Sequence, residues 1–115
     1  MRLHPCVACG FLVFEEPIGS YAICPICGWE DDHVQARYPG SAIGANHVSL
    51  YEYQQTIALK KAPLSVGLHR GARRLSGWRP LRVDEASARA NEPTGGRSYF
   101  EATTEDDPPY YWETS

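Results

Sequence analysis

The four cysteines of this chain fall into two pairs, and their spacing constrains the fold more than any other feature. Cys6 and Cys9 form the first C-x2-C pair, and Cys24 and Cys27 form the second after fourteen intervening residues. Two tight turns of this kind can bring four thiolates around one tetrahedral ion, about 2.3 Å from each sulfur, and the spacing is typical of zinc sites. We therefore predict that the four cysteines bind one structural Zn2+ ion.

The same ligand set is also used by other kinds of site. A closed zinc site is favoured, because four thiolates leave no coordination position for a substrate. An iron centre of the rubredoxin type would use the same ligands for electron transfer, and the two pairs could instead be redox-active or form disulfides. Most of this chain lies after the second pair, whereas rubredoxin-type chains are usually shorter.

The segments next to the cysteines predict a β-hairpin. Residues 10–14 and 20–24 are rich in apolar, aromatic and β-branched side chains and would form its strands, with residues 15–19 as the turn. Both cysteine pairs would then lie at the open end of one hairpin, as in a zinc ribbon. Gly10 and Gly28 directly follow the pairs and permit the positive φ that such turns often need.

A helix is predicted to follow, packed on this hairpin. Ser49 and Glu52 have the spacing of a capping box, and Pro63 would end the helix. Its apolar face would comprise Leu50, Tyr53, Ile57 and Ala58. The predicted fold class is small α+β: a zinc-ribbon β-hairpin with a packed helix and an irregular, partly extended C-terminal region.

The chain is expected to divide into a zinc-ribbon domain over 1–63 and a C-terminal extension over 64–115. The extension contains an arginine-rich segment, a Gly/Pro linker and a tail that is both acidic and aromatic. The arginines are Arg70, Arg73, Arg74, Arg79 and Arg82. They could clamp phosphates, face the acidic tail or be solvated. A helix in this segment would place Arg70, Arg73 and Arg74 on one face.

Composition narrows the classes of function. The 115 residues carry a net charge of -3, which argues against a general polyanion-binding protein. No apolar stretch approaches the roughly 18 residues of a membrane span, and the N-terminus lacks signal-peptide features, so a cytoplasmic location without membrane contact is expected. No catalytic motif is assembled, which predicts a non-enzymatic protein without a small-molecule substrate.

Longer sequence runs resemble the bacterial cysteine-rich CPCC family over about residues 4–60. The most specific are Cys24-Pro25-Ile26-Cys27-Gly28-Trp29-Glu30-Asp31-Asp32 and Gly44-Ala45-Asn46-His47-Val48-Ser49-Leu50. The family's Cys-Pro-Cys-Cys motif is altered here, because Val7 and Ala8 replace its proline and middle cysteine. The resemblance implies that this middle cysteine is dispensable for a four-ligand site. Some members resemble immunity proteins encoded beside secreted polymorphic toxins.

Three functions are therefore open. The favoured hypothesis is an immunity protein that binds and neutralises a toxin acting in the cytoplasm, such as a nuclease, because an acidic surface can steer onto a basic toxin. The alternatives are a nucleic-acid-binding zinc ribbon and a rubredoxin-like electron carrier. The predicted partner contacts are Glu30, Asp31, Asp32, Glu105, Asp106, Asp107, Tyr110, Tyr111 and Trp112.

Overall fold

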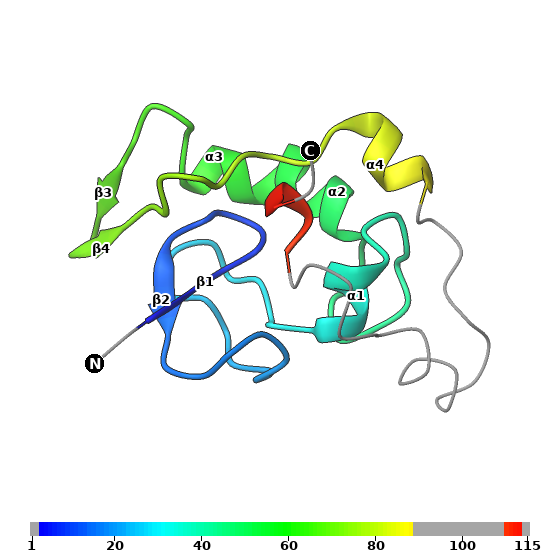
Figure 1. Ribbon diagram of the computed structural model, residues 1–115, viewed down its shortest axis with the longest axis horizontal. Coiled ribbons are helices and arrows are strands. Elements are labelled where there is room, and N and C mark those ends of the chain that lie inside the picture. Colours follow the sequence, from blue (N-terminus) through cyan, green and yellow to red (C-terminus); the bar gives the residue numbers. More distant parts are fainter. Residues whose placement is uncertain (1–2, 89–109, 114–115) are drawn as a thin grey trace.

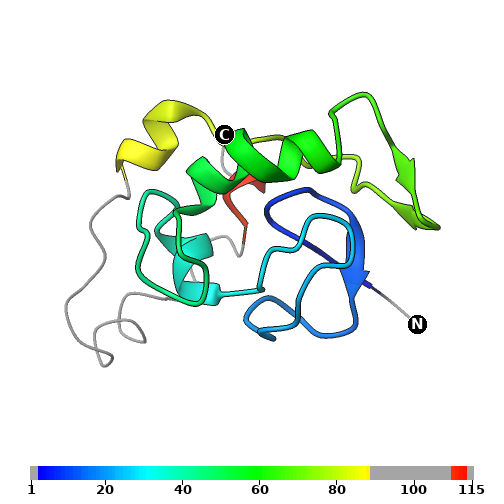
Figure 2. The same ribbon diagram turned by 180° about the vertical axis from the view of Figure 1, so that it is seen from behind.

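The computed structural model describes residues 3–88 and 110–113 as short elements of a small α+β protein. Two antiparallel sheets, each of two strands, lie beside a helical segment that crosses both cysteine turns (Figures 1 and 2). This agrees with the predicted fold class. In chain order the elements are β1 (His4–Pro5), β2 (Leu12–Phe14), α1 (His33–Arg37), α2 (Leu50–Tyr53), η1 (Gln54–Ala58), α3 (Leu59–Lys61), β3 (Leu68–His69), β4 (Ala72–Arg73), α4 (Val83–Ala88) and η2 (Tyr111–Glu113).

The strand pairing around the cysteines differs from the prediction. Strand β2 pairs with β1, across the first cysteine pair, and not with residues 20–24. Those residues instead fold back around the second cysteine pair, where Ile23 and Glu30 form an isolated antiparallel bridge. Each C-x2-C turn reverses the chain by itself, so each turn closes its own small hairpin. We call residues 5–11 knuckle 1 and residues 23–30 knuckle 2.

The predicted helix is present, and it has an unexpected wide turn in its middle. The Ser49 hydroxyl accepts a hydrogen bond from the backbone N–H of Glu52 at 3.1 Å, which confirms the N-cap. Helices α2 and α3 are joined without a break by the π-helical η1, whose turn holds more than 3.6 residues. The fully buried positions consequently recur every four residues, at Leu50, Gln54, Ala58 and Ala62. The predicted apolar face left out Gln54 because glutamine is polar.

The arginine-rich segment forms a hairpin where a shared helical face was considered. Strands β3 and β4 pair through a tight turn in which Arg70 and Gly71 have φ of 50° and 79°. Positive φ at both central residues is the geometry that suits a two-residue hairpin turn. Arg70, Arg73 and Arg74 therefore do not lie on one helix face.

The core of the protein is built on the two knuckles. Phe11 and Trp29, each two residues after the second cysteine of a pair, are fully buried, as is Leu50 of α2. No helix in the described part of the chain is long and apolar enough to cross a membrane.

Candidate metal centre

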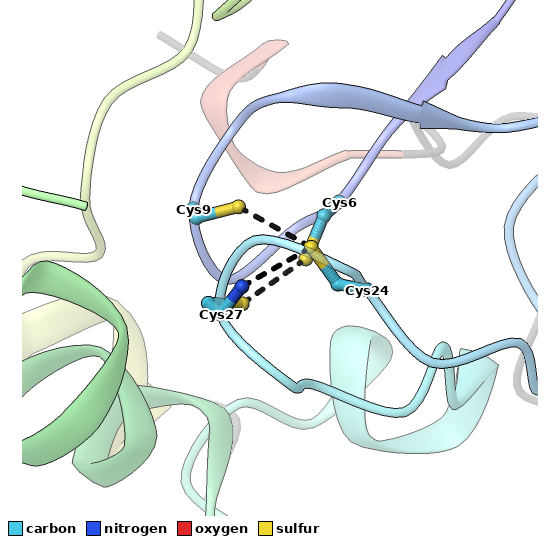
Figure 3. A group of neighbouring side chains, drawn as sticks. All are labelled: Cys6, Cys9, Cys24 and Cys27. Atoms are coloured by element: carbon cyan, nitrogen blue, oxygen red, sulfur yellow. Dashed lines mark hydrogen bonds between the residues drawn. The ribbon is translucent and has the colours of Figure 1, made fainter. Parts of the chain in front are cut away.

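The four predicted ligands come together in the structure. Their Sγ atoms all lie within 4.8 Å of one another (Figure 3). The distances from Cys6 to Cys27 and from Cys9 to Cys24 are both 3.7 Å. A tetrahedral ion with metal–sulfur bonds of about 2.3 Å requires sulfur–sulfur separations of about 3.8 Å, whereas a disulfide requires about 2.05 Å. The cluster therefore has the dimensions of a metal site, and all four cysteines are free.

The two knuckles hold their cysteines with the same backbone hydrogen bonds. In knuckle 1 the N–H of Cys6 donates to the carbonyl of Phe11 at 2.9 Å, and that of Gly10 donates to the carbonyl of Cys6 at 2.7 Å. In knuckle 2 the N–H of Cys24 donates to the backbone carbonyl of Trp29 at 2.8 Å, and that of Gly28 donates to the backbone carbonyl of Cys24 at 2.9 Å. The glycines have φ of 82° and 88°, as their positions in the sequence predicted.

Burial and mutual hydrogen bonding shift the pKa values of the clustered thiols. Burial raises the pKa of the Cys6 thiol well above its usual value, with hydrogen bonds from the other three cysteines adding to this effect. The pKa of Cys24 is lowered, chiefly by hydrogen bonding with Cys27. The Cys24 sulfur also accepts the backbone N–H of Ile26 at 3.3 Å and of Cys27 at 3.5 Å. Such donors offset the charge that thiolates carry when a metal binds.

Arg74 supplies a cation beside this negative cluster. Its Nε donates to the carbonyl of Cys9 at 2.7 Å, and its guanidinium carbon lies 4.6 Å from the centre of the Phe11 ring. The other guanidinium nitrogens donate to carbonyls just beyond α3, namely those of Ala62, Pro63 and Val66. Burial lowers the pKa of Arg74, and the nearby Cys9 and Cys27 oppose that shift. One side chain thus joins knuckle 1 to the end of the helix.

Knuckle 1 is covered by side chains from three distant segments. The carbonyl oxygen of Val7 accepts hydrogen bonds from Gln54 Nε2 and Trp78 Nε1, both at 3.1 Å, and from the Tyr111 hydroxyl at 3.4 Å. The Trp78 ring also lies against Gly10, where an added Cβ would be 2.5 Å from the ring. These contacts leave Cys6 and Cys9 with no exposed surface.

Knuckle 2 is covered by the helix. The Tyr53 hydroxyl donates to the carbonyl of Cys27 at 2.7 Å, and its ring packs edge-on against Trp29 with centroids 5.1 Å apart. Cys24 is 2% exposed and Cys27 is fully buried. With both knuckles covered, a metal held by the four sulfurs would be closed to substrates, which is the arrangement of a structural site.

The structure corrects the predicted role of two acidic residues. Asp31 and Asp32 were predicted to face a partner, but both are buried. One oxygen of Asp31 accepts the Ser20 hydroxyl at 2.8 Å and the backbone N–H groups of Gly19 and Ser20 at 3.1 Å. Asp32 caps α1 by accepting the N–H of Val34 at 2.8 Å. The short side chain of aspartate can reach nearby backbone N–H groups, so these two carboxylates form hydrogen bonds inside the protein.

A buried polar network, which was not predicted from the sequence, holds the run from Gly44 to Leu50 in place. Gln35 Nε2 donates to the carbonyls of Ser41, Asn46 and Val48 at 3.0 to 3.2 Å, and its Oε1 accepts from the Asn46 backbone and side chain. The Asn46 amide in turn pairs with the backbone of Glu30 in both directions, at 3.0 and 2.9 Å. The network fastens the loop before the helix to knuckle 2. No spacing rule signals such a contact.

The aromatic end of the chain packs on the domain. The Tyr111 hydroxyl, besides its contact with Val7, accepts from Gln54 Nε2 at 2.8 Å and donates to the carbonyl of Arg79. The hydroxyl is thus used for contacts within the protein, and the partner role of the half-buried Tyr111 stays a prediction. Tyr110 and Trp112 are half-buried and stack with centroids 4.6 Å apart, and their partner role stays a prediction. Glu105, Asp106 and Asp107 lie outside the described residues.

Four of the five arginines make side-chain contacts within the protein, and two of these four, Arg74 and Arg79, are half-buried. Arg74 has the carbonyl contacts given above. Arg79 forms a two-point ion pair with Glu85, with both nitrogen–oxygen distances at 2.8 Å. Hydrogen bonding from Arg79 lowers the pKa of Glu85. Arg70, Arg73 and Arg82 remain exposed.

The fold and its centre together define a zinc-binding module of the zinc-ribbon type. Four buried cysteines close together can hold one metal ion, and the ligand set and spacing suit a single structural zinc. Residues 4–60 match the model of the family described as Cysteine-rich CPCC, and through this segment the chain belongs to that family. None of the curated proteins matches the chain.

Proposed function

We propose that this chain is a non-enzymatic, zinc-stabilised protein-binding module that acts in the cytoplasm as an immunity protein and neutralises a cognate toxin. The observation that carries the proposal is the closure of the metal centre. All four cysteines are at most 2% exposed, so an ion bound there would stabilise the fold. Binding to a partner would then take place through the outer surface of the protein. The acidic net charge and the immunity-like members of the family support a basic toxin as the partner.

The contact surface that best fits this role comprises two residues of knuckle 2 and the nearby Tyr21. Tyr21 and Ile23 are 54% and 65% exposed, although large apolar side chains are usually buried. Tyr21 also has a φ of 61°, a conformation that is uncommon for an aromatic residue and is often found at functional sites. Glu30 lies opposite Ile23 in the isolated bridge and adds a carboxylate. We call Tyr21, Ile23 and Glu30 the knuckle 2 face.

The experiment is co-expression of the full chain with the product of the adjacent gene, followed by affinity purification. A stoichiometric complex and survival of cells that express the toxin are expected. Ile23→Lys should weaken the complex about 10-fold or more, because it places a charge in an apolar contact. Leu64→Lys, at an exposed leucine outside this face, is the matched control. A chain that purifies alone and gives no protection would refute the proposal.

A further inference from the structure

A second surface of the protein, formed by the two sheets, has a different chemistry from the knuckle 2 face. A hollow of about 460 Å³ lies between β2 and β4. The residues that line it include the aliphatic Leu3, Leu12, Val13 and Ala72 and the cationic Arg70 and Arg73. We call this hollow the β2–β4 groove.

Among the residues that the structure describes, one isolated bridge joins the two sheets beside the groove. Phe11, just before β2, and Arg74, just after β4, form an isolated antiparallel bridge. Beyond it, β2 is paired only with β1 and β4 only with β3, so the ladder between the sheets does not continue along the groove. The groove lies between β2 and β4 next to this bridge, and it is open to solvent.

Within residues 3–88 and 110–113, the charges of the groove have no acidic counterpart. Arg70 uses one nitrogen for a hydrogen bond of 3.3 Å to the carbonyl of Pro25, and both Arg70 and Arg73 are exposed. No carboxylate among the described residues forms an ion pair with either one, whereas Arg79 and Arg82 both meet Glu85. Guanidinium groups bind carboxylates at two points, so the carboxylates of an acidic ligand could form ion pairs with Arg70 and Arg73.

The shape and lining of the groove select among the acidic ligands. Leu3 is 39% exposed, and Leu12, Val13 and Ala72 are half-buried, so the floor is too open to enclose a small molecule. The floor contains no aromatic ring on which a base could stack, which disfavours single-stranded nucleic acid. Aliphatic residues on the floor and cations at the side match an extended peptide with alternating apolar and acidic side chains.

We propose that the β2–β4 groove binds an extended, acidic and aliphatic segment of a partner protein. The apolar side chains of the segment would contact Leu12 and Val13, and its carboxylates would meet Arg70 and Arg73. The proposal does not rest on the toxin-binding function, because it uses different residues, and a chain without a toxin partner would still carry this groove.

The first test is selection of a displayed library of random linear peptides on the zinc-loaded full chain. We expect the enriched peptides to combine acidic with aliphatic residues. Synthetic versions should bind the R70E/R73E variant at least about 10-fold more weakly, since two attractive contacts become repulsive. The K60E/K61E variant carries the same change of charge at the exposed end of α3 and should bind as the wild type does. Equal binding to both double variants would overturn the proposal.

The second test locates the bound peptide by nuclear magnetic resonance. The backbone amides of Leu12, Val13 and Ala72 should shift on titration with the selected peptide, and those of Tyr21 and Ile23 should not. Shifts confined to Tyr21 and Ile23 would overturn the groove proposal and would not contradict the proposed role of the knuckle 2 face. Tighter binding of a single-stranded oligonucleotide than of any peptide would also overturn it, because it would assign the arginines to phosphates.

Discussion

Gly10 and Gly28 occupy equivalent positions in the two knuckles, and substituting each with alanine separates two physical effects. Both residues have φ near 85°, so alanine at either position should cost about 1 to 2 kcal/mol of backbone strain. Only Gly10 is also packed against a ring, since its added Cβ would lie 2.5 to 2.9 Å from three atoms of Trp78. A Cβ added at Gly28 would lie 3.0 Å from its nearest neighbour, the hydroxyl oxygen at the end of the Tyr53 side chain.

The two variants should therefore differ in stability by the cost of the overlap alone. Forcing an extra carbon into a packed contact costs about 1 to 3 kcal/mol, so Gly10→Ala should lose about 2 to 5 kcal/mol in total and Gly28→Ala about 1 to 2 kcal/mol. The assay is urea unfolding of the zinc-loaded chain at fixed free zinc, followed by far-ultraviolet circular dichroism. Chelator competition on the same samples measures how far the distortion of knuckle 1 weakens zinc binding.

A double-mutant cycle with Trp78→Ala tests the assigned cause. Removing the ring destabilises the protein by itself, but it also removes the atoms that the new Cβ would meet. In that background Gly10→Ala should cost no more than Gly28→Ala costs in the wild type. Equal losses for the two glycine variants in the wild-type background, or an additive cycle, would refute the assigned contact between Gly10 and Trp78.

Three further perturbations address the centre and its support. Cys24→Ser should lower bound zinc after dialysis from one ion per chain to nearly none by elemental analysis, and full retention of zinc would contradict the ligand assignment. Arg74→Lys should destabilise the zinc-loaded chain by about 1 to 3 kcal/mol in urea unfolding, because lysine keeps the charge but cannot reach four carbonyls, whereas Arg73→Lys at an exposed position should have little effect. The pKa of Glu85 is lowered by hydrogen bonding from Arg79, so its stabilisation is present above its ordinary pKa of 4.5 and is lost as pH falls through the folded value. Thermal unfolding of Glu85→Gln should therefore converge with that of the wild type at acid pH, and a constant difference across pH would exclude this linkage.

The metal ligands and the main helix could be predicted from the sequence because both depend on short-range geometry. A C-x2-C-Gly turn carries its own hydrogen bonds, and the two copies fold alike although Phe11 follows one and Trp29 the other. The N-cap at Ser49 is equally local, since donor and acceptor are three residues apart. Such features do not depend on which distant segment packs against them.

The roles of the polar and aromatic residues depended on contacts between distant segments and could not be predicted in this way. Asp31 and Asp32 look like a solvated acidic run, and only the fold shows that backbone donors surround them. The polar Gln54 can lie in the core because its amide bonds to Val7, Tyr111 and Leu81. A local pattern contains no record of these neighbours.

The cover of the metal centre shows the same distinction most clearly. The sequence names four cysteines that can hold an ion, because ligand chemistry and turn geometry are properties of a few adjacent residues. Whether that ion is open or closed depends on Trp78 and Tyr111, which reach the carbonyl of Val7 from 71 and 104 residues away. Hydrogen bonds of that range form only when the whole chain has packed, so the structural character of the centre comes from tertiary folding.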